Sequence, residues 1–463
     1  MKYLIRIFVF SLLISLWLPI FSVNAQQGME NRPVWLSASG QKSSNLSNKQ
    51  QVNSLSENTL DVLITFPGVW AEMQNENGVD FTRIWQDEYS SYREPGQPVL
   101  PGKAYNILIP YGAQVEILNQ TVTSEKISLS DYSLPATITP AQIQVSKSEP
   151  PPPWTEPDPQ HYSSPNTFPQ NWYELQSTFQ IRDYTILPLW INPVRYSPGK
   201  GEIEILEQIE LRLTWQTSSV DGTRNAVVSD SPSFDRLVRQ LVINPPDLSV
   251  YNTKAETGEG YLIITPDEFE DALRPFVDMK ENQGYEVSLT KLSEIDTIYE
   301  DHSVTSIQNY IKSIVPPPVY LLLVGDTNLI PGFNLTNYSG FAYSFDKTTD
   351  LYYGTLDDDF IPDIAVGRLP VRNIGDLTTV INKISSYNYM GFQRWQSNTS
   401  FIASCDYYAI TEESHNDVME KRTSPLGYPT FFPVNQDLTG GDHLYCYTFS
   451  ARTNDILNSI NNK

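Results

Sequence analysis

The sequence predicts a β-rich, sandwich-like front half followed by an α/β back half with a doubly wound, mostly parallel sheet. In the front half, apolar and polar residues alternate with period two, for example along 202–206 and 209–215, which is typical of antiparallel strands with one buried face. In the back half, continuous apolar segments at 261–264 and 319–324 alternate with helical segments, as in sheets that are buried on both faces. Two domains are expected, because 463 residues exceed a typical domain of ~150 residues.

The first 25 residues predict a secretory signal peptide. Two basic residues precede an apolar segment from 7 to 20, and the small residues that follow predict cleavage after Ala25. The alternative is an uncleaved membrane anchor, although the apolar segment is shorter than the roughly 20 residues that a membrane span needs. No other segment is apolar enough to cross a bilayer. We therefore expect a secreted or cell-surface protein with no membrane span after the signal is removed.

The front half is predicted to begin after a flexible lead-in. Residues 26–56 are polar and rich in Ser, Asn and Gln, whereas residues 57–250 show the short alternating segments of a β-rich domain. Within this domain, residues 147–169 carry Pro at a density that excludes regular strand pairing and predicts an extended, exposed connector. The predicted strands are 61–66, 104–110, 114–118, 179–181, 184–189, 202–206 and 209–215.

The back half, residues 255–463, is predicted to alternate strands and helices. Its first strand is followed by Thr265-Pro266-Asp267-Glu268, a capping box with Pro in the first turn, which predicts a helix to about Gln283 that ends at Gly284. The later predicted elements are strands 285–289, 319–324, 363–369 and 400–404 and helices 306–314 and 377–387. In such a sheet, functional groups lie on loops at the carboxyl ends of the strands.

The charge of the chain excludes one class of partner. The sequence has 31 basic and 54 acidic side chains, a net charge of −23, and no cluster of Lys and Arg. A chain of this charge is repelled by phosphate backbones, so we expect no nucleic-acid partner. The acidity is consistent with solubility and with binding of hard cations.

The densest acidic segment predicts a calcium site. Asp357, Asp358, Asp359 and Asp363 lie within seven residues next to a predicted strand, and carboxylate oxygens are preferred ligands of Ca²⁺. We expect Asp357, Asp359 and Asp363 to bind a structural Ca²⁺, with a solvated acidic turn as the alternative because no EF-hand pattern is present. Asp326 follows another predicted strand and is either a turn residue or a further cation ligand.

The sequence offers few candidates for a nucleophile. It has two cysteines, Cys405 and Cys446, and four histidines. His443 precedes Cys446 by three residues, a spacing that defines no known Cys–His pair, and Cys405 ends an apolar strand, where a packed thiol is common. A disulfide between the two cysteines is equally open from the sequence. The motifs GxSxG, HExxH, CxxC and the P-loop are absent, so the residues alone predict a secreted two-domain protein with a calcium site.

Several segments carry a family resemblance. GYLIITPDEFEDALRPFVDMKENQGYEV, VYLLLVGDTNLIPGF, DLYYGTLDDDFIPDIAVGRLPV and SFIASCDYYAITEESHNDVMEK follow one another between residues 260 and 432. In this order they resemble the gingipain family of clan CD cysteine peptidases, which has a caspase-like fold. In the front half, GQPVLPGKAYNILIPYGAQVEI and YTILPLWINPVRYSPGKGEIEILEQIELRLTW resemble the gingipain pro-domain.

The resemblance implies a secreted cysteine endopeptidase zymogen that acts on protein or peptide substrates. Its pro-domain would bind its own peptidase domain and hold it inactive until cleavage, for which Arg224, Arg236 and Arg239 are candidate sites. Glu412 matches the position at which arginine-cleaving members place a carboxylate just before a His. The resemblance therefore implies that Glu412 lies in the substrate pocket and favours a basic residue before the scissile bond.

The family's catalytic residues have no match in this sequence. The catalytic His of the family lies in a Gly-His-Gly loop and the nucleophilic Cys ends a later strand, both after the part that matches DILNSINNK, and Gly-His-Gly is absent here. We therefore expect an inactive fragment of a longer peptidase or a truncated reading frame, with no catalytic residue within this chain. Two other functions remain open: a sortase-like transpeptidase of type IX secretion, and a non-catalytic secreted binding protein that retains the fold.

Overall fold

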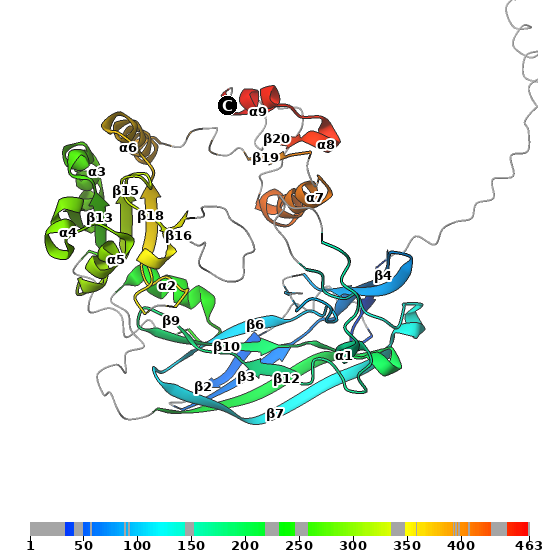
Figure 1. The fold of residues 1–463 in the computed structure, drawn as a ribbon. Coiled ribbons are helices and arrows are strands. Elements are labelled where there is room, and N and C mark those ends of the chain that lie inside the picture. Colours follow the sequence, from blue (N-terminus) through cyan, green and yellow to red (C-terminus); the bar gives the residue numbers. More distant parts are fainter. Residues whose placement is uncertain are drawn as a thin grey trace, which may run out of the picture. The chain divides into compact units, whose positions relative to one another are not determined.

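The chain forms two compact units. The computed structural model describes residues 33–40, 50–55, 58–87, 89–90, 93–143, 152–217, 231–245, 258–334, 348–357, 359–391, 393, 396, 399–405, 408–426 and 442–461. The predicted signal peptide and its cleavage after Ala25 lie outside these residues. The first unit consists of Met1–Glu259 and Leu351–Ala365, and the second of Gly260–Asp350 and Val366–Lys463. Figure 1 labels the elements of both.

The described residues of the first unit form three sheets whose paired strands run antiparallel. The first sheet has the order β1 (Val34–Leu36), β4 (Val69–Glu76), β5 (Val79–Trp85). The second has the order β6 (Lys103–Ile109), β10 (Tyr184–Ile191), β8 (Tyr173–Leu175), and β9 (Phe179–Ile181) also pairs with β10. The third has the order β11 (Val194–Ser197), β12 (Glu202–Thr217), β3 (Thr59–Thr65), β2 (Gln50–Leu55), and β7 (Ala113–Ser128) also pairs with β12.

Two of these strands lie within residues 26–56, so the expectation of a flexible lead-in is wrong for them. Strand β1 pairs with β4, with Trp35 opposite Trp70 and their rings edge to face at 5.2 Å. Strand β2 pairs with β3, with Val52 opposite Val62. The sequence of β2, QQVNSL, is mostly polar, and its conformation follows from pairing with a half-buried neighbour rather than from its own hydrophobic pattern.

One hydrophobic core joins the three sheets. Its fully buried members come from each of them and include Leu36, Leu60, Ile107, Leu189 and Leu211. Burial alternates residue by residue along β3, as the period-two pattern of the sequence predicts. The alternating residues therefore place one face of each strand in this core.

The Pro-rich connector is more firmly held than expected. Its described part, residues 152–169, contains no strand but includes the short helix α1 (Pro159–Tyr162), whose first turn is capped by Asp158. The backbone N–H of Thr155 donates to Gln142 Oε1 at 2.8 Å, and the Tyr162 hydroxyl donates to the Ile138 carbonyl at 2.7 Å. These bonds replace the strand pairing that Pro excludes, and they hold this part of the connector in place, although several of its residues, such as Pro159 and Gln160, are exposed as expected.

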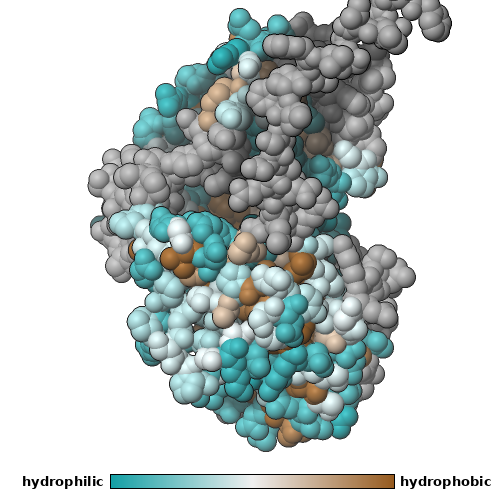
Figure 2. Space-filling view, turned by 90° about the vertical axis from the view of Figure 1, so that its right-hand side faces the viewer, coloured by the Kyte–Doolittle hydropathy of each residue, from teal (hydrophilic) through white to brown (hydrophobic). Residues whose placement is uncertain are grey.

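The described surface is mainly hydrophilic on the face shown in Figure 2. Hydrophilic and intermediate residues cover most of this face, and hydrophobic ones lie in small separate groups. Such scattered apolar residues are ordinary for protein surfaces. Among the helices that the structure describes, none combines the length and the hydropathy needed to cross a membrane.

The second unit is built on a four-stranded sheet of the order β14, β13, β15, β18, with helices beside it (Figure 1). Strand β13 (Gly260–Thr265) pairs in parallel with β14 (Glu286–Lys291) and with β15 (Tyr320–Val324), and β18 (Ala365–Leu369) follows β15 in the sheet. The parallel pairing predicted from the continuous apolar segments is confirmed for these strands. Helices α3 (Glu270–Asn282) and α6 (Ile374–Tyr389) share a core with the sheet, and α4 (Leu292–Tyr299) and α5 (Val304–Ser313) complete this part.

The helix after β13 begins differently from the prediction. Thr265 is fully buried and its hydroxyl donates to the Val324 carbonyl at 3.4 Å, so Thr265 does not cap the helix. A 3₁₀ turn, Asp267–Phe269, precedes α3 instead. Gly284 follows the helix with a φ of 92°, the left-handed conformation that commonly ends helices.

A second, two-stranded sheet lies in the last part of the chain. Strands β19 (Ser400–Ala403) and β20 (Asp442–Tyr445) pair in parallel. The helices α7 (Tyr408–Val418), α8 (Cys446–Phe449) and α9 (Thr453–Asn461) accompany this sheet. Because the strands are parallel, their carboxyl ends lie at the same edge, the edge at which α/β sheets carry their functional groups.

Candidate functional site

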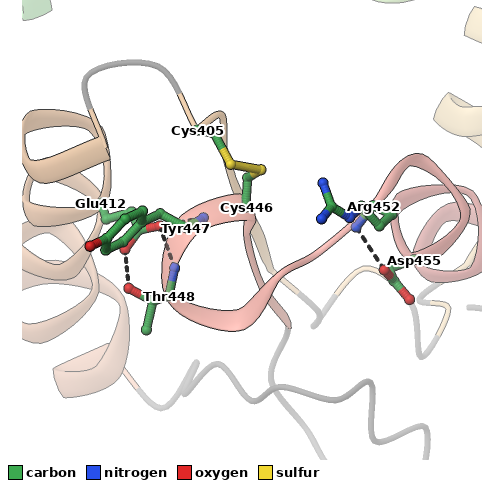
Figure 3. Close-up of a disulfide and its surroundings, with 7 residues drawn as sticks. All are labelled: Cys405, Glu412, Cys446, Tyr447, Thr448, Arg452 and Asp455. Carbon is green, nitrogen blue, oxygen red and sulfur yellow. Dashed lines mark hydrogen bonds between the residues drawn. A yellow bond between two sulfur atoms is a disulfide. The ribbon is translucent and has the colours of Figure 1, made fainter.

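A disulfide closes the carboxyl edge of the β19–β20 sheet. Cys405 lies two residues after β19, and Cys446 directly follows β20 as the first residue of α8. Their sulfur atoms are 1.99 Å apart and their Cα atoms 5.0 Å apart (Figure 3). The parallel pairing brings both strand ends to one edge, and this makes the bridge possible although 41 residues separate the two cysteines.

The bridge decides between the alternatives that the sequence left open for the cysteines. The part of the chain that the structure describes has no free cysteine, and the whole sequence has only these two. Neither thiol is therefore available as a nucleophile while the bridge is intact, since nucleophilic attack requires a thiolate.

Glu412 lies beside this disulfide and binds the first turn of α8 (Figure 3). Its side chain projects from α7 and is 7% exposed. Glu412 Oε1 accepts the backbone N–H groups of Tyr447 at 3.2 Å and Thr448 at 3.1 Å, and Oε2 accepts the Thr448 hydroxyl. These donors lie at the start of a helix, where N–H groups lack partners within the helix. The residue predicted for the substrate pocket is thus placed at the carboxyl edge, with both oxygens hydrogen-bonded.

The histidines do not form a Cys–His pair in the described part of the chain. His161 and His302 each have Nδ1 close to an aspartate carboxylate, at 3.0 and 2.8 Å. The rings of His415 and His443 lie 6.0 and 5.2 Å from that of Tyr445, and the buried Nδ1 of His415 has no hydrogen-bond partner. Burial, followed by the charge of Glu412, raises the pKa of Tyr445.

The turn after β15 is fixed by an arginine that the sequence analysis missed. Arg368 of β18 makes two 2.7 Å bonds to the carboxylate of Asp350, and its guanidinium also donates to the carbonyls of Gly325 at 2.7 Å and Ile330 at 2.9 Å. Gly325 has a φ of 151°, which favours glycine. In the sequence, this role of Arg368 is indicated only by the presence of an Arg within a predicted strand.

Asp326 is a paired turn residue. Its carboxylate accepts a hydrogen bond from Arg372 Nε at 2.8 Å, and this bond is the main reason that the pKa of Asp326 is lowered. Asp326 also accepts the backbone N–H of Thr327 at 2.8 Å. Of the two expectations for Asp326, the structure supports the turn residue.

The carboxylates of the acidic loop face N–H groups. Asp363 is 3% exposed, and its two oxygens accept the backbone N–H groups of Arg182 at 2.5 Å and of Leu356 at 2.9 Å. Asp359 accepts a backbone N–H two residues further on at 2.6 Å, and Asp357 accepts that of Asp359 at 3.3 Å. Burial raises the pKa of both Asp359 and Asp363 despite these bonds.

This arrangement does not fit the predicted calcium ligands. A calcium ion needs six to eight oxygen ligands with free lone pairs directed at it, whereas oxygens of Asp357, Asp359 and Asp363 bind N–H donors. Asp358 lies outside the described residues. Among the described residues, no group of three or more acidic, His or Cys side chains is placed to hold a metal ion. Calcium binding at this loop stays a prediction that titration of the protein with Ca²⁺ would test.

The predicted cleavage sites for removal of the propeptide lie in different structural environments. Arg224 lies outside the described residues, whereas Arg236 and Arg239 lie within helix α2 (Pro232–Leu241). Arg236 is exposed and Arg239 is half-buried. A peptidase must unfold such a helix before it can cut there, because local opening exposes the bond.

Two family models match successive parts of the chain. The model described as Propeptide_C25 matches residues 44–232, and the model described as Peptidase family C25 matches residues 254–462. The chain is a gingipain-type member of this peptidase family. The predicted front and back halves thus correspond to a propeptide and to part of a peptidase domain.

Curated relatives and solved structures come from the same family. The sequence is 26% identical to Lys-gingipain W83 of Porphyromonas gingivalis over 333 residues, 68% of this chain and 18% of that protein. It is 21% identical to gingipain R2 of the same species over 336 residues, 71% of this chain and 43% of that protein. A structure of gingipain K from this species, described as an insight into zymogenic latency, aligns with 40% of this chain and all of its own at 20% identity and a TM-score of 0.35. The chain therefore spans less than half the length of these curated relatives.

Proposed function

We propose that this chain is the front part of a secreted cysteine endopeptidase zymogen of the gingipain type. The observation that carries the proposal is the order of the two family matches, a propeptide at 44–232 directly followed by a peptidase segment at 254–462. The front unit would act as the inhibitor of its own peptidase domain, and protein or peptide chains would be the substrates. Export would depend on the segment before Ala25.

The nucleophile of the proposed peptidase comes from outside residues 1–463. Both cysteines of this sequence are joined in the disulfide, so they cannot supply a thiolate. In the whole protein a thiolate would attack the peptide carbonyl, and a His would protonate the leaving amine. Residues 1–463 alone would behave as a non-catalytic protein that retains part of the fold, and the paired cysteines favour this second function for them.

Glu412 would favour a basic residue before the scissile bond. Its carboxylate lies at the carboxyl edge of the β19–β20 sheet, and two backbone N–H groups at 3.1 and 3.2 Å fix its position. A carboxylate held in a fixed position suits a guanidinium or ammonium group of the substrate. Glu412 would therefore be a specificity residue.

The first test uses a thiol-reactive peptide. The complete gene product should react with a chloromethyl ketone that carries Arg or Lys, and mass spectrometry should find the label on a cysteine beyond residue 463. Residues 26–463 alone should hydrolyse no peptide and take up no label unless a reductant opens the bridge. Thiol-sensitive hydrolysis by residues 26–463 would contradict the proposal.

The second test separates specificity from catalysis. In the complete protein, Glu412→Gln should lower kcat/KM for substrates with Arg before the scissile bond relative to substrates with Leu. Glu413→Gln is the matched control, because Glu413 is the next residue on α7 and is exposed. An unchanged preference in Glu412→Gln would refute the role of Glu412 and leave the peptidase assignment intact.

A further inference from the structure

Arg182 has an unusual backbone conformation at the tip of a hairpin. Strands β9 and β10 pair with Ile181 opposite Tyr184, which leaves only Arg182 and Asp183 for the turn. Arg182 has a φ of 53°, in the left-handed region that residues with a side chain seldom adopt. Such a conformation persists when surrounding contacts fix it, and it is enriched at functional positions.

The contacts that fix Arg182 come from two later parts of the chain. Its backbone N–H donates to Asp363 Oδ1 at 2.5 Å, and its guanidinium donates to the Asp363 carbonyl at 3.0 Å. The guanidinium carbon also lies 5.2 Å from the centre of the Phe234 ring in α2, within the range of a cation–π contact. Asp363 and Phe234 are 3% and 6% exposed, so these contacts are shielded from water.

These partners lie beyond the part of the chain that matches the propeptide. Phe234 follows that match, which ends at residue 232, and Asp363 lies inside the peptidase match of 254–462. The segment Leu351–Ala365 nevertheless belongs to the first compact unit. The hairpin therefore binds a segment of the peptidase part within the unit that the propeptide part builds.

We propose that the hairpin of β9 and β10, with Arg182 at its tip, is the surface by which the propeptide retains the acidic segment Leu351–Ala365 after the connecting chain has been cut. This proposal rests on the proposed propeptide role of the front unit. It names the retained segment and the residue that holds it. The left-handed backbone of Arg182 directs its N–H at the carboxylate of Asp363, and the guanidinium of Arg182 donates a hydrogen bond to the backbone carbonyl of Asp363.

A second contact also joins the part that matches the propeptide to the part that matches the peptidase. The carboxylate of Glu259 accepts bonds from the Ser231 hydroxyl at 2.7 Å and from the Ser233 N–H and hydroxyl at 2.8 Å each, at the start of α2. Glu259 lies in the peptidase match, and Ser231 lies in the propeptide match. Loss of Arg182 would therefore weaken retention without removing every contact.

The test cuts the full chain and follows the separation of the products. A recognition sequence for a site-specific protease is inserted between residues 246 and 257, the purified chain is cut, and size-exclusion chromatography and surface plasmon resonance follow the two fragments. The wild-type fragments should elute together. Arg182→Ala and Arg182→Gly should dissociate about 10- to 100-fold faster, the usual effect of losing a hydrogen bond to a charged group in a buried contact.

The two variants separate retention from folding. Arg182→Gly relieves the left-handed backbone and so favours the hairpin turn, which means that faster dissociation of this variant cannot come from an unfolded hairpin. Arg212→Ala is the control, because Arg212 pairs with Asp61 at 2.7 Å on the exposed surface of the same unit, and its dissociation rate should equal that of wild type. Immediate separation of the wild-type fragments, or a wild-type rate in Arg182→Gly, would overturn the proposal. The assay needs no peptidase activity, so its failure would leave the proposed function untouched.

Discussion

Removal of the Cys405–Cys446 disulfide should open the small β19–β20 sheet. The bridge joins residues 41 positions apart, and a loop of this length loses about 13 cal/mol/K of chain entropy on closure, which is about 4 kcal/mol at 25 °C. The two strands have four residues each, and such a short pair is weak by itself. In the double variant Cys405→Ser/Cys446→Ser, the contact between Glu412 and α8 remains to hold this helix.

The effect should be measured locally, because a protein of two units does not give one well-defined unfolding midpoint. Hydrogen exchange with mass spectrometry should show amides of 442–449 exchanging faster by up to about three orders of magnitude. Amides of α6, in the same unit, and of β12, in the other unit, should be unchanged. Reduction and alkylation of the wild-type protein should reproduce the result without a mutation. An increase below about threefold would refute the argument from loop entropy.

Four further outcomes follow from the described contacts. Glu412→Ala leaves two N–H groups of α8 without an acceptor, so exchange at the Thr448 amide should rise about tenfold, and an unchanged rate would exclude the cap. Burial raises the pKa of Asp363 above its ordinary value of 3.8, so the folded unit binds the proton of this carboxyl more tightly than the unfolded chain does. The stability that results from proton binding is present at low pH and is lost as the pH rises through the raised pKa. The free energy of unfolding of the first unit in wild type should therefore fall relative to that in Asp363→Asn as the pH rises from about 4 to about 7, whereas parallel curves of this free energy against pH would contradict the raised pKa. Arg368→Lys loses the paired bonds to Asp350 and should destabilise the turn after β15 by about 2 kcal/mol, seen as faster exchange in residues 325–334. Excess Ca²⁺ should leave hydrogen exchange in the segment Leu351–Ala365 unchanged if the N–H donors exclude the ion from the acidic loop, and a saturable slowing of exchange would restore the calcium site.

The sequence correctly predicted those strands whose own residues show the hydrophobic pattern of a strand. Strand β13 contains the continuous apolar segment 261–264 and is a parallel strand as predicted. The alternating residues of β12 form an antiparallel strand as predicted. Strand β2 was missed because its sequence is polar and its conformation depends on pairing with β3. The predicted capping box at Thr265 was wrong because the buried Thr265 hydroxyl donates to the Val324 carbonyl of the neighbouring strand. This partner lies 59 residues away in the sequence, so a local sequence pattern does not reveal it.

The candidate site was harder to predict than the fold for a related reason. From the sequence, Glu412 was predicted to bind a basic residue of the substrate and Asp363 was predicted to bind a calcium ion. In the structure each is less than 10% exposed, and each accepts two backbone N–H bonds. A buried carboxylate must find donors, and backbone N–H groups are donors that every residue except Pro carries, so the residue types of a sequence do not disclose them.

The same physical fact separates the two acids in function. The donors of Glu412 all lie in the first turn of α8, so its carboxylate is fixed at the carboxyl edge of a parallel sheet, the edge that carries functional groups in α/β folds. The donors of Asp363 come from one distant segment, the β9–β10 hairpin with Arg182, and from its own loop with Leu356. The carboxylate of Glu412 thus binds a single helix, whereas that of Asp363 links its own loop to the β9–β10 hairpin. For this reason we propose a specificity role for Glu412 and a role in retaining the propeptide for Asp363 and Arg182.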